Sequence, residues 1–139
     1  MVKLSISLVA RALPGYLVCR YIRVMTTRTM TEPAFFILTA LADQPRHGYG
    51  IVGETAKLSD GRVRLKVGTL YGVLDRLADQ GLVELDHEEV QQGRLRRYYR
   101  LTEPGSRALA AEAERQAANA RAAARRLRVR QAAHARGGA

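Results

Sequence analysis

An apolar stripe in residues 67–81 constrains the fold of this chain more than any other feature. Its large apolar side chains are spaced by three, four and three residues, which is the period of one helix face: Val67, Leu70, Leu74 and Leu77. Gly81 follows and predicts the end of the helix. The pattern predicts a helix that packs on a core with one face and leaves the other open.

The open face of this helix is smooth. It carries Gly68, Thr69, Gly72, Asp75 and Arg76, with Lys66 and Tyr71 at its borders. Each glycine costs a helix about 1 kcal/mol relative to alanine, so two on one face contribute little to stability. They allow another surface to approach closely, and the DNA major groove accommodates a helix of this kind.

Two shorter helices are predicted before it. Thr31 can cap a helix over about 32–42, in which Pro33 is tolerated in the first turn. Residues 47–50 are interpreted as a turn that leads into a second helix over about 48–58. Residues 59–61, Ser-Asp-Gly, close that helix.

A hairpin is predicted after the third helix. Residues 82–86 and 97–101 alternate apolar and polar side chains as half-buried strands do, and a polar turn, 88–94, lies between them. Three short helices followed by a hairpin indicate a winged helix-turn-helix. The expected fold class is mainly α with this small hairpin and one further helix.

That further helix is predicted from residue 103 to about 130, capped by Thr102. It carries an apolar seam with steps of four and three: Leu109, Ala113, Ala117, Ala120, Ala124 and Leu127. A lone helix buries nothing, so we expect it to pair with its own copy in a homodimer. Residues 136–139 are expected to fray.

The basic charge is concentrated at the two ends of the chain. The formal net charge is +10, yet residues 30–103 hold ten basic and eleven acidic side chains. Residues 1–29 hold five basic and no acidic residues, and residues 104–139 hold eight arginines against two glutamates. An anionic partner is indicated, either nucleic acid or a membrane surface. In the middle of the chain the charges nearly cancel, so only the placement of individual charges can indicate a binding surface there.

Nothing in the sequence indicates an enzyme, a cofactor or a metal. Cys19 is the only cysteine, which excludes an internal disulfide and any multi-cysteine zinc site. The three histidines are too far apart in sequence to form a spaced ligand motif, and no phosphate-binding loop is present. We interpret His47 as a helix-start residue.

Residues 1–29 are expected to be an N-terminal extension, either disordered or absent from the working protein. Met25 and Met30 offer later starts, and Arg11 interrupts the apolar run that a signal peptide would need. We therefore expect a cytoplasmic protein without stable membrane association. A bacterial source, and association with the nucleoid when the protein is bound to DNA, are implied only by the family resemblance that follows.

The region from Met30 to about Leu109 resembles the PadR family of bacterial transcriptional regulators. The resemblance rests on the order and spacing of short motifs: Phe36-Ile37-Leu38 with Leu41, His47-Gly48-Tyr49, Gly68-Thr69-Leu70-Tyr71, Leu74 with Leu77, Gly81-Leu82-Val83, and Arg97-Tyr98-Tyr99-Arg100-Leu101-Thr102 with Gly105. The single helix after the wing is similar to the subfamily with a short C-terminal segment.

The resemblance implies a homodimer that binds a palindromic operator, usually as a repressor released by a small molecule or by stress. It implies that the recognition helix enters the major groove and that the wing touches the backbone. By matching position, Thr69 and Tyr71 would face groove and phosphate, and Tyr49 would brace the second helix or touch phosphate. The implied division is a DNA-binding domain over 30–102 and a dimerisation helix over 103–139.

Most of the predicted DNA-binding residues have a plainer alternative. The set is Tyr49, Arg62, Arg64, Lys66, Thr69, Tyr71, Arg76, Arg94, Arg96 and Arg97. Tyr71 could be a half-buried core residue, and the basic run before the third helix could be merely solvated. The wing arginines could balance the acids of the opposite strand.

Two other functions stay open at this point. The same fold could be a protein-interaction module without specific DNA binding, and the two basic ends could bind an anionic membrane. No aromatic-lined pocket for an effector can be identified, because the tail lacks Trp, Tyr and Phe.

Overall fold

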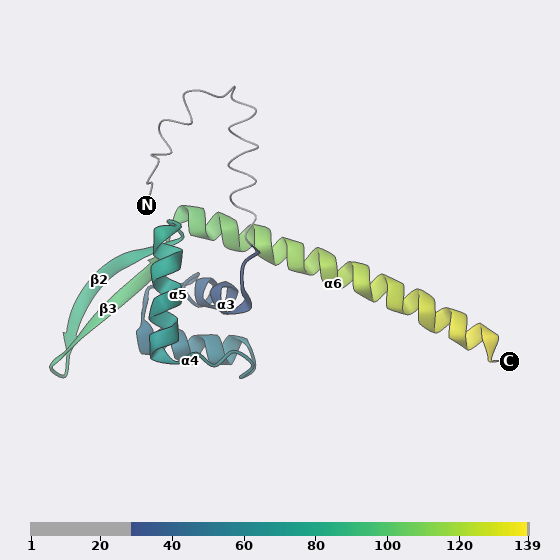
Figure 1. Cartoon of the computed structure of the whole chain (residues 1–139), viewed down its shortest axis with the longest axis horizontal. Helices are drawn as coiled ribbons and strands as arrows, with labels where there is room; N and C mark the ends of the chain where they lie inside the picture. Colours follow the sequence, from purple (N-terminus) through teal and green to yellow (C-terminus); the bar gives the residue numbers. More distant parts are fainter. Residues whose placement is uncertain (1–28, 139) are drawn as a thin grey trace, which may run out of the picture.

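A computed structural model of the chain describes residues 29–138. The expected extension over 1–29 lies outside the described residues apart from Thr29. The elements are α3 (Glu32–Ala40), β1 (Arg46–His47), α4 (Gly48–Leu58), α5 (Val67–Asp79), β2 (Val83–Gln91), β3 (Arg94–Leu101) and α6 (Glu103–Gly137). This order is the winged helix-turn-helix that the sequence predicts, mainly helical with a small sheet (Figure 1).

The core lies where the apolar faces of α3, α4 and α5 meet, and the start of β2 closes it with Val83. Its fully buried large apolar side chains come from all three helices: Ile37, Leu38, Ile51, Leu70 and Leu74. The predicted stripe of α5 is confirmed, with Val67 half-buried at its N-terminal end. Burial of this stripe fixes which face of α5 is left open.

The first helix is capped as predicted but ends earlier than expected. The backbone N–H of Ala34 donates to the Thr31 hydroxyl over 3.4 Å. The prediction that the helix extends to residue 42 is wrong, because α3 ends at Ala40 and Leu41 caps it. The guanidinium of Arg46 donates to the Ala40 carbonyl over 2.7 Å, which satisfies one of the last free carbonyl groups of the helix.

The wing is longer than predicted. Residues 88–94 do not form a turn, because β2 and β3 continue as a paired ribbon up to a connection of two residues, Gln92 and Gly93. Both have positive φ, 51° and 74°, the geometry of the tight hairpin turns whose twist matches that of paired strands. The prediction of a long polar turn is therefore wrong.

A third strand was not predicted. Residues 46–47 form β1 and pair with β3, so the sheet order is β1-β3-β2, and the interpretation of His47 as part of a turn is wrong. A bulge at Asp86 shifts the register between β2 and β3, so that His87 lies opposite Tyr98. The sheet therefore ties the start of α4 directly to the wing.

The last helix begins against the domain and then leaves it. Thr102 caps α6 by accepting from the backbone N–H of Gly105 over 3.1 Å. A side chain at Gly105 would collide with the backbone carbonyl of Leu82, so α6 starts in close contact with the chain that enters the wing. The helix packs on α3 and extends to Gly137 (Figure 1), so the predicted end near residue 130 is wrong, and Arg136 and Gly137, which were expected to fray, are helical.

Candidate nucleic-acid interface

The open face of α5 is exposed as the sequence predicts. Thr69, Gly72 and Arg76 are exposed, on the opposite side of the helix from buried Leu70 and Leu74. A Cβ added at Gly68 or Gly72 would meet no atom within 4 Å. The face is therefore smooth because its glycines are open to solvent, and no internal contact requires them.

The N-terminus of α5 lacks a side-chain cap. Lys66 occupies the capping position and makes no side-chain hydrogen bond there. By contrast, Thr31, His47 and Thr102 cap α3, α4 and α6 with side-chain acceptors. The first N–H groups of α5 thus have no side-chain acceptor, next to an exposed ammonium group.

Tyr71 joins α5 to the start of α4. Its ring is 37% exposed, and its hydroxyl would lie 2.8 Å from a Cβ placed on Gly48. The Tyr71 and Tyr99 rings are 6.5 Å apart, and burial raises the pKa of Tyr99 above its usual value. Tyr49 follows Gly48 in α4 and is 68% exposed. Both tyrosines are therefore open to solvent close to where α5 meets the start of α4.

His47 links α4 to the wing, and sequence reasoning missed this. Its Nδ1 accepts from the backbone N–H of Gly50 over 3.3 Å, and its Nε2 lies 3.2 Å from the guanidinium of Arg96. The Tyr98 ring stacks on His87 at 4.3 Å and meets His47 edge-on at 5.3 Å. Burial and the Arg96 charge lower the pKa of His47, and Glu89 opposes them. The neutral ring is thus the form that fits.

The wing arginines have different surroundings. Arg97 donates to Glu88 over 3.0 Å, as the charge-balancing alternative predicts for this residue. Arg96 is half-buried beside His47, and Arg94 is exposed next to the turn at the wing tip. In the described range, neither Arg94 nor Arg96 forms an ion pair with an acid. These two arginines are therefore wing charges that no acid balances in the described range, and Arg96 also contacts His47.

The three basic residues before α5 also differ in what they contact. Arg62 donates to Glu32 over 2.8 Å and lies over the Phe36 ring at 5.9 Å, which turns it toward α3. Arg64 donates only to the backbone carbonyl of Gly61, over 3.2 Å. The structure thus brings Lys66 and Arg64 to the start of α5, whereas the charge of Arg62 is partly balanced elsewhere.

The predicted seam of α6 falls into two parts. Leu109 is half-buried against the core of its own chain. Ala113, Ala117, Ala120 and Leu127 are exposed, and Ala124 is half-buried. The seam beyond residue 112 therefore remains open on the projecting part of the helix.

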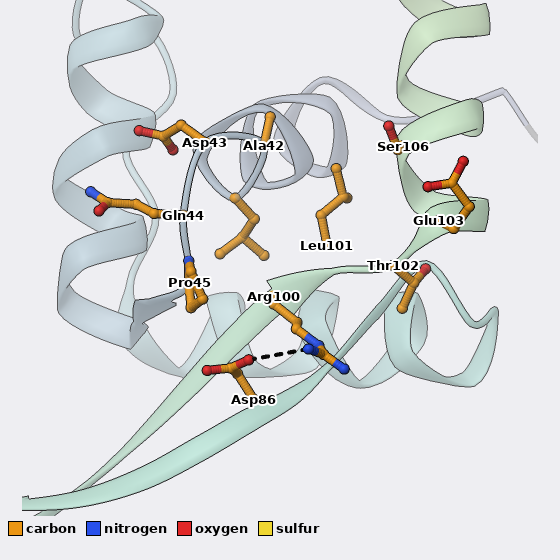
Figure 2. Close-up of a pocket in the computed structure, with 11 residues that line it drawn as sticks. Ala42, Asp43, Gln44, Pro45, Asp86, Arg100, Leu101, Thr102, Glu103 and Ser106 are labelled. Carbon is orange, nitrogen blue, oxygen red and sulfur yellow. Dashed lines mark ion pairs between the residues drawn. The ribbon is translucent and has the colours of Figure 1, made fainter.

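A shallow hollow lies on another side of the domain, between the α3–β1 loop, the base of the wing and the start of α6 (Figure 2). Its cation, Arg100, is bonded to Glu84 over 2.8 Å and lies 3.5 Å from Asp86. Its lining includes no aromatic side chain. The hollow therefore offers neither a free charge nor an aromatic wall to an effector.

Comparison with known families decides the affiliation of the chain. The family model of PadR-like transcriptional regulators matches residues 37–111, more than half of the chain. This chain belongs to the PadR-like family. Members of this family are transcription regulators and not enzymes, in agreement with the prediction from the sequence.

Similar proteins show the same fold. A PadR family transcription regulator from Clostridium difficile R20291 is 25% identical, with a TM-score of 0.57 over 70% of this chain and 99% of that one. A PadR family regulator from Eggerthella lenta is 22% identical, with a TM-score of 0.55 over 81% and 97%. An uncharacterized protein from Lysinibacillus sphaericus is 33% identical over 69 residues, half of this chain and 63% of that relative's length.

Among residues 29–138, none of the helices contains an apolar stretch of the length that a bilayer-spanning helix requires.

Proposed function

We propose that this PadR-like regulator binds a specific double-stranded DNA operator through α5 and the wing. The observation that carries the proposal is the open face of α5, where Gly68 and Gly72 leave room for a close approach. Exposed donors surround this face, among them Lys66, Thr69 and Arg76. A helix presented in this way fits the major groove, where side chains can reach base edges.

Phosphate contacts would come from the borders of this face. Tyr hydroxyls, Arg and Lys side chains and free helix N–H groups all bind phosphate. Tyr49, Arg64 and Tyr71 lie near the start of α4 and α5, and Arg94 and Arg96 lie on the wing. We assign Arg62 and Arg97 a smaller share, because Glu32 and Glu88 already bind them.

The active form is proposed to be a homodimer on a palindromic operator. The seam of α6 beyond residue 112 has no partner within the described chain, and a second copy would cover it. Two-fold symmetry would then place two α5 helices in successive major grooves, about one helical turn or a multiple apart. Repression, relieved by a small molecule or by stress, is the mode that the family resemblance supports.

Binding to a selected operator tests the proposal through two substitutions. Arg76→Ala and Tyr71→Phe should each weaken binding by about tenfold to a hundredfold, since a hydrogen bond to a charged group contributes roughly 1.5–3 kcal/mol. Arg107→Ala, on α6 and paired with Glu103, is the matched control. Unchanged affinity in both α5 variants would remove this helix from the interface.

A protein-interaction module is the second candidate, because the same smooth face could receive another protein. Salt dependence separates the two candidates. Phosphate neutralisation makes log K fall with log salt by about 0.9 per contact, and a protein partner imposes no such slope.

A further inference from the structure

The distal part of α6, residues 116–138, has a composition that dimerisation does not explain. We call it the distal arm. It contains six arginines and no acidic residue: Arg121, Arg125, Arg126, Arg128, Arg130 and Arg136. The ion pairs of α6 lie before it, between Arg107 and Glu103 and between Arg115 and Glu112. Six positive charges are therefore unbalanced within the arm.

The arm is open to solvent along its length. All its residues are exposed except Ala124, and Figure 1 shows this end of α6 projecting away from the three-helix core. A seam contact alone would not need these charges, since the seam beyond residue 112 consists of alanines and Leu127. A binding partner for the arginines would therefore be separate from the second chain that would cover the seam.

Three of the arginines form a stripe beside the seam. Arg121, Arg125 and Arg128 are spaced by four and three residues, so they share one face of the helix. Each of Arg121, Arg125 and Arg128 directly follows a seam residue, which places it about 100° around the helix. Pairing of two seams would therefore leave the stripe exposed at the edge of the dimer.

Pairing would also concentrate like charge. Two arms side by side carry twelve arginines without an acid, and charges closer than about 8 Å repel one another with little screening at physiological salt. A polyanion along the arms would offset this repulsion. The helical part of the arm is about 33 Å long at 1.5 Å per residue, close to one helical turn of duplex DNA, ~34 Å.

We propose that the distal arm is a second DNA contact, which binds the phosphate backbone through Arg121, Arg125 and Arg128 without reading bases. Arginine supplies the phosphate contacts that dominate non-specific binding. A membrane surface fits less well, because Leu127 and Val129 are the only large apolar side chains exposed on the arm. The proposal adds a surface to the DNA binding proposed above and uses none of the same residues.

The test is the salt dependence of binding by the full chain to a random-sequence duplex of about 40 bp, roughly four helical turns. Arg121→Gln, Arg125→Gln and Arg128→Gln are combined in one variant, and the same three positions changed to Lys form the matched control. The glutamine variant should show a slope of log K against log salt that is shallower by about 2.7 per protomer, or about 5.4 per dimer when both arms bind, at about 0.9 per lost contact. The lysine variant should keep the slope of the unchanged protein. Arg107→Gln, whose arginine is paired with Glu103, should also leave it unchanged.

Three results would overturn the proposal. One is an unchanged slope in the glutamine variant with the dimer intact by light scattering. Another is an equal loss in the lysine variant, since charge would then not be the cause. The third is co-sedimentation with anionic vesicles that the glutamine variant loses while its DNA slope stays the same. Substitutions in α5 should change binding to the operator and not binding to random-sequence DNA. The salt slope on random-sequence DNA therefore tests the arm even if α5 proves not to recognise an operator.

Discussion

At the scale of single residues, the contact between Gly48 and Tyr71 determines where one proposed phosphate ligand lies. The space that a side chain at residue 48 would fill is taken by the Tyr71 hydroxyl and the end of its ring. Because Tyr71 is more than a third exposed, its ring can swing outward at small cost. A methyl group at residue 48 should therefore move the hydroxyl and leave the fold intact.

Gly48→Ala is expected to weaken operator binding about tenfold, the effect of losing one hydrogen bond to phosphate. Thermal unfolding should change little, and affinity can be followed by fluorescence anisotropy. In a Tyr71→Phe background the same substitution should cause no additional loss, because the hydroxyl is already gone. An additive loss would show that the position of Tyr71 is not what Gly48 controls.

His47 makes the fold sensitive to acid. Its Nδ1 must be unprotonated to accept from Gly50, and a charged ring would also face the Arg96 guanidinium. The pKa of His47 is lowered in the folded protein, so the unfolded chain binds the proton more tightly. The contribution of His47 to stability is therefore full above its ordinary pKa of about 6.5 and is lost as pH falls below that value.

The free energy of unfolding, measured with urea at a series of pH values, should fall as pH decreases below about 6.5. His47→Asn keeps a good capping acceptor that does not titrate, so this part of the pH dependence should be reduced. His87→Asn serves as the matched control on the wing and should retain it. Equal pH profiles for the unchanged protein and His47→Asn would contradict the assignment.

At the scale of elements, the glycines on the open face make α5 less stable than alanines would. Gly72 lies in the middle of the helix, exposed and free of contacts, where alanine would favour the helix by about 1 kcal/mol. Gly53 has the same environment on α4, outside the proposed interface. The two glycines therefore differ only in whether a groove is expected to approach them.

Gly72→Ala should raise Tm by about 4–8 °C and lower operator affinity about tenfold, because the added methyl group occupies the docked face at a cost of roughly 1–3 kcal/mol. Gly53→Ala should raise Tm similarly and leave affinity unchanged. Calorimetry and a binding titration on the same samples give both numbers. A stabilised Gly72→Ala protein with full affinity would mean that this face does not contact DNA.

Local patterns predicted the helices well and the sheet less well. The bounds of α4 and the stripe of α5 follow from caps, glycines and apolar spacing within a few residues. The length of the wing depends on a turn at Gln92 and Gly93, which lacks the usual Asn-Gly signal. The strand β1 forms only because β3, about fifty residues later, pairs with it.

For the candidate interface as well, local contacts could be predicted from the sequence and long-range contacts could not. The exposure of Thr69 and Arg76 follows from the helix period, so the sequence could predict it. The pairing of Arg62 with Glu32 joins residues thirty positions apart, and no local pattern shows it. The contact of His47 with Arg96 also depends on the pairing of β1 with β3. The alternation of Arg96, Tyr98 and Arg100 on one face of β3 was the signal available for that cluster.

At the scale of the whole molecule, the proposals above assign two purposes to α6: its seam to dimerisation and its arginines to DNA. Leu127 is 57% exposed and lies in the seam, whereas Val129 is 69% exposed and lies about 200° further around the helix. A charge at either position is tolerated by the single chain. Only a charge in the seam should oppose pairing.

Leu127→Glu is expected to weaken dimerisation more than tenfold, since an unpaired charge would be buried between two apolar seams at a cost of several kcal/mol. Val129→Glu places the same charge outside the seam and should remain dimeric. Light scattering at several concentrations distinguishes the two. A dimeric Leu127→Glu protein would refute the assignment of the seam.

The most direct test of the whole account is capture of genomic DNA fragments by the purified full chain, followed by footprinting of the best fragment with the unchanged protein and with Arg76→Ala. The account predicts protection of an inverted repeat with half-sites one helical turn or a multiple apart, and loss of that protection in the variant. Binding without a preferred site, or equal protection by both proteins, would contradict it.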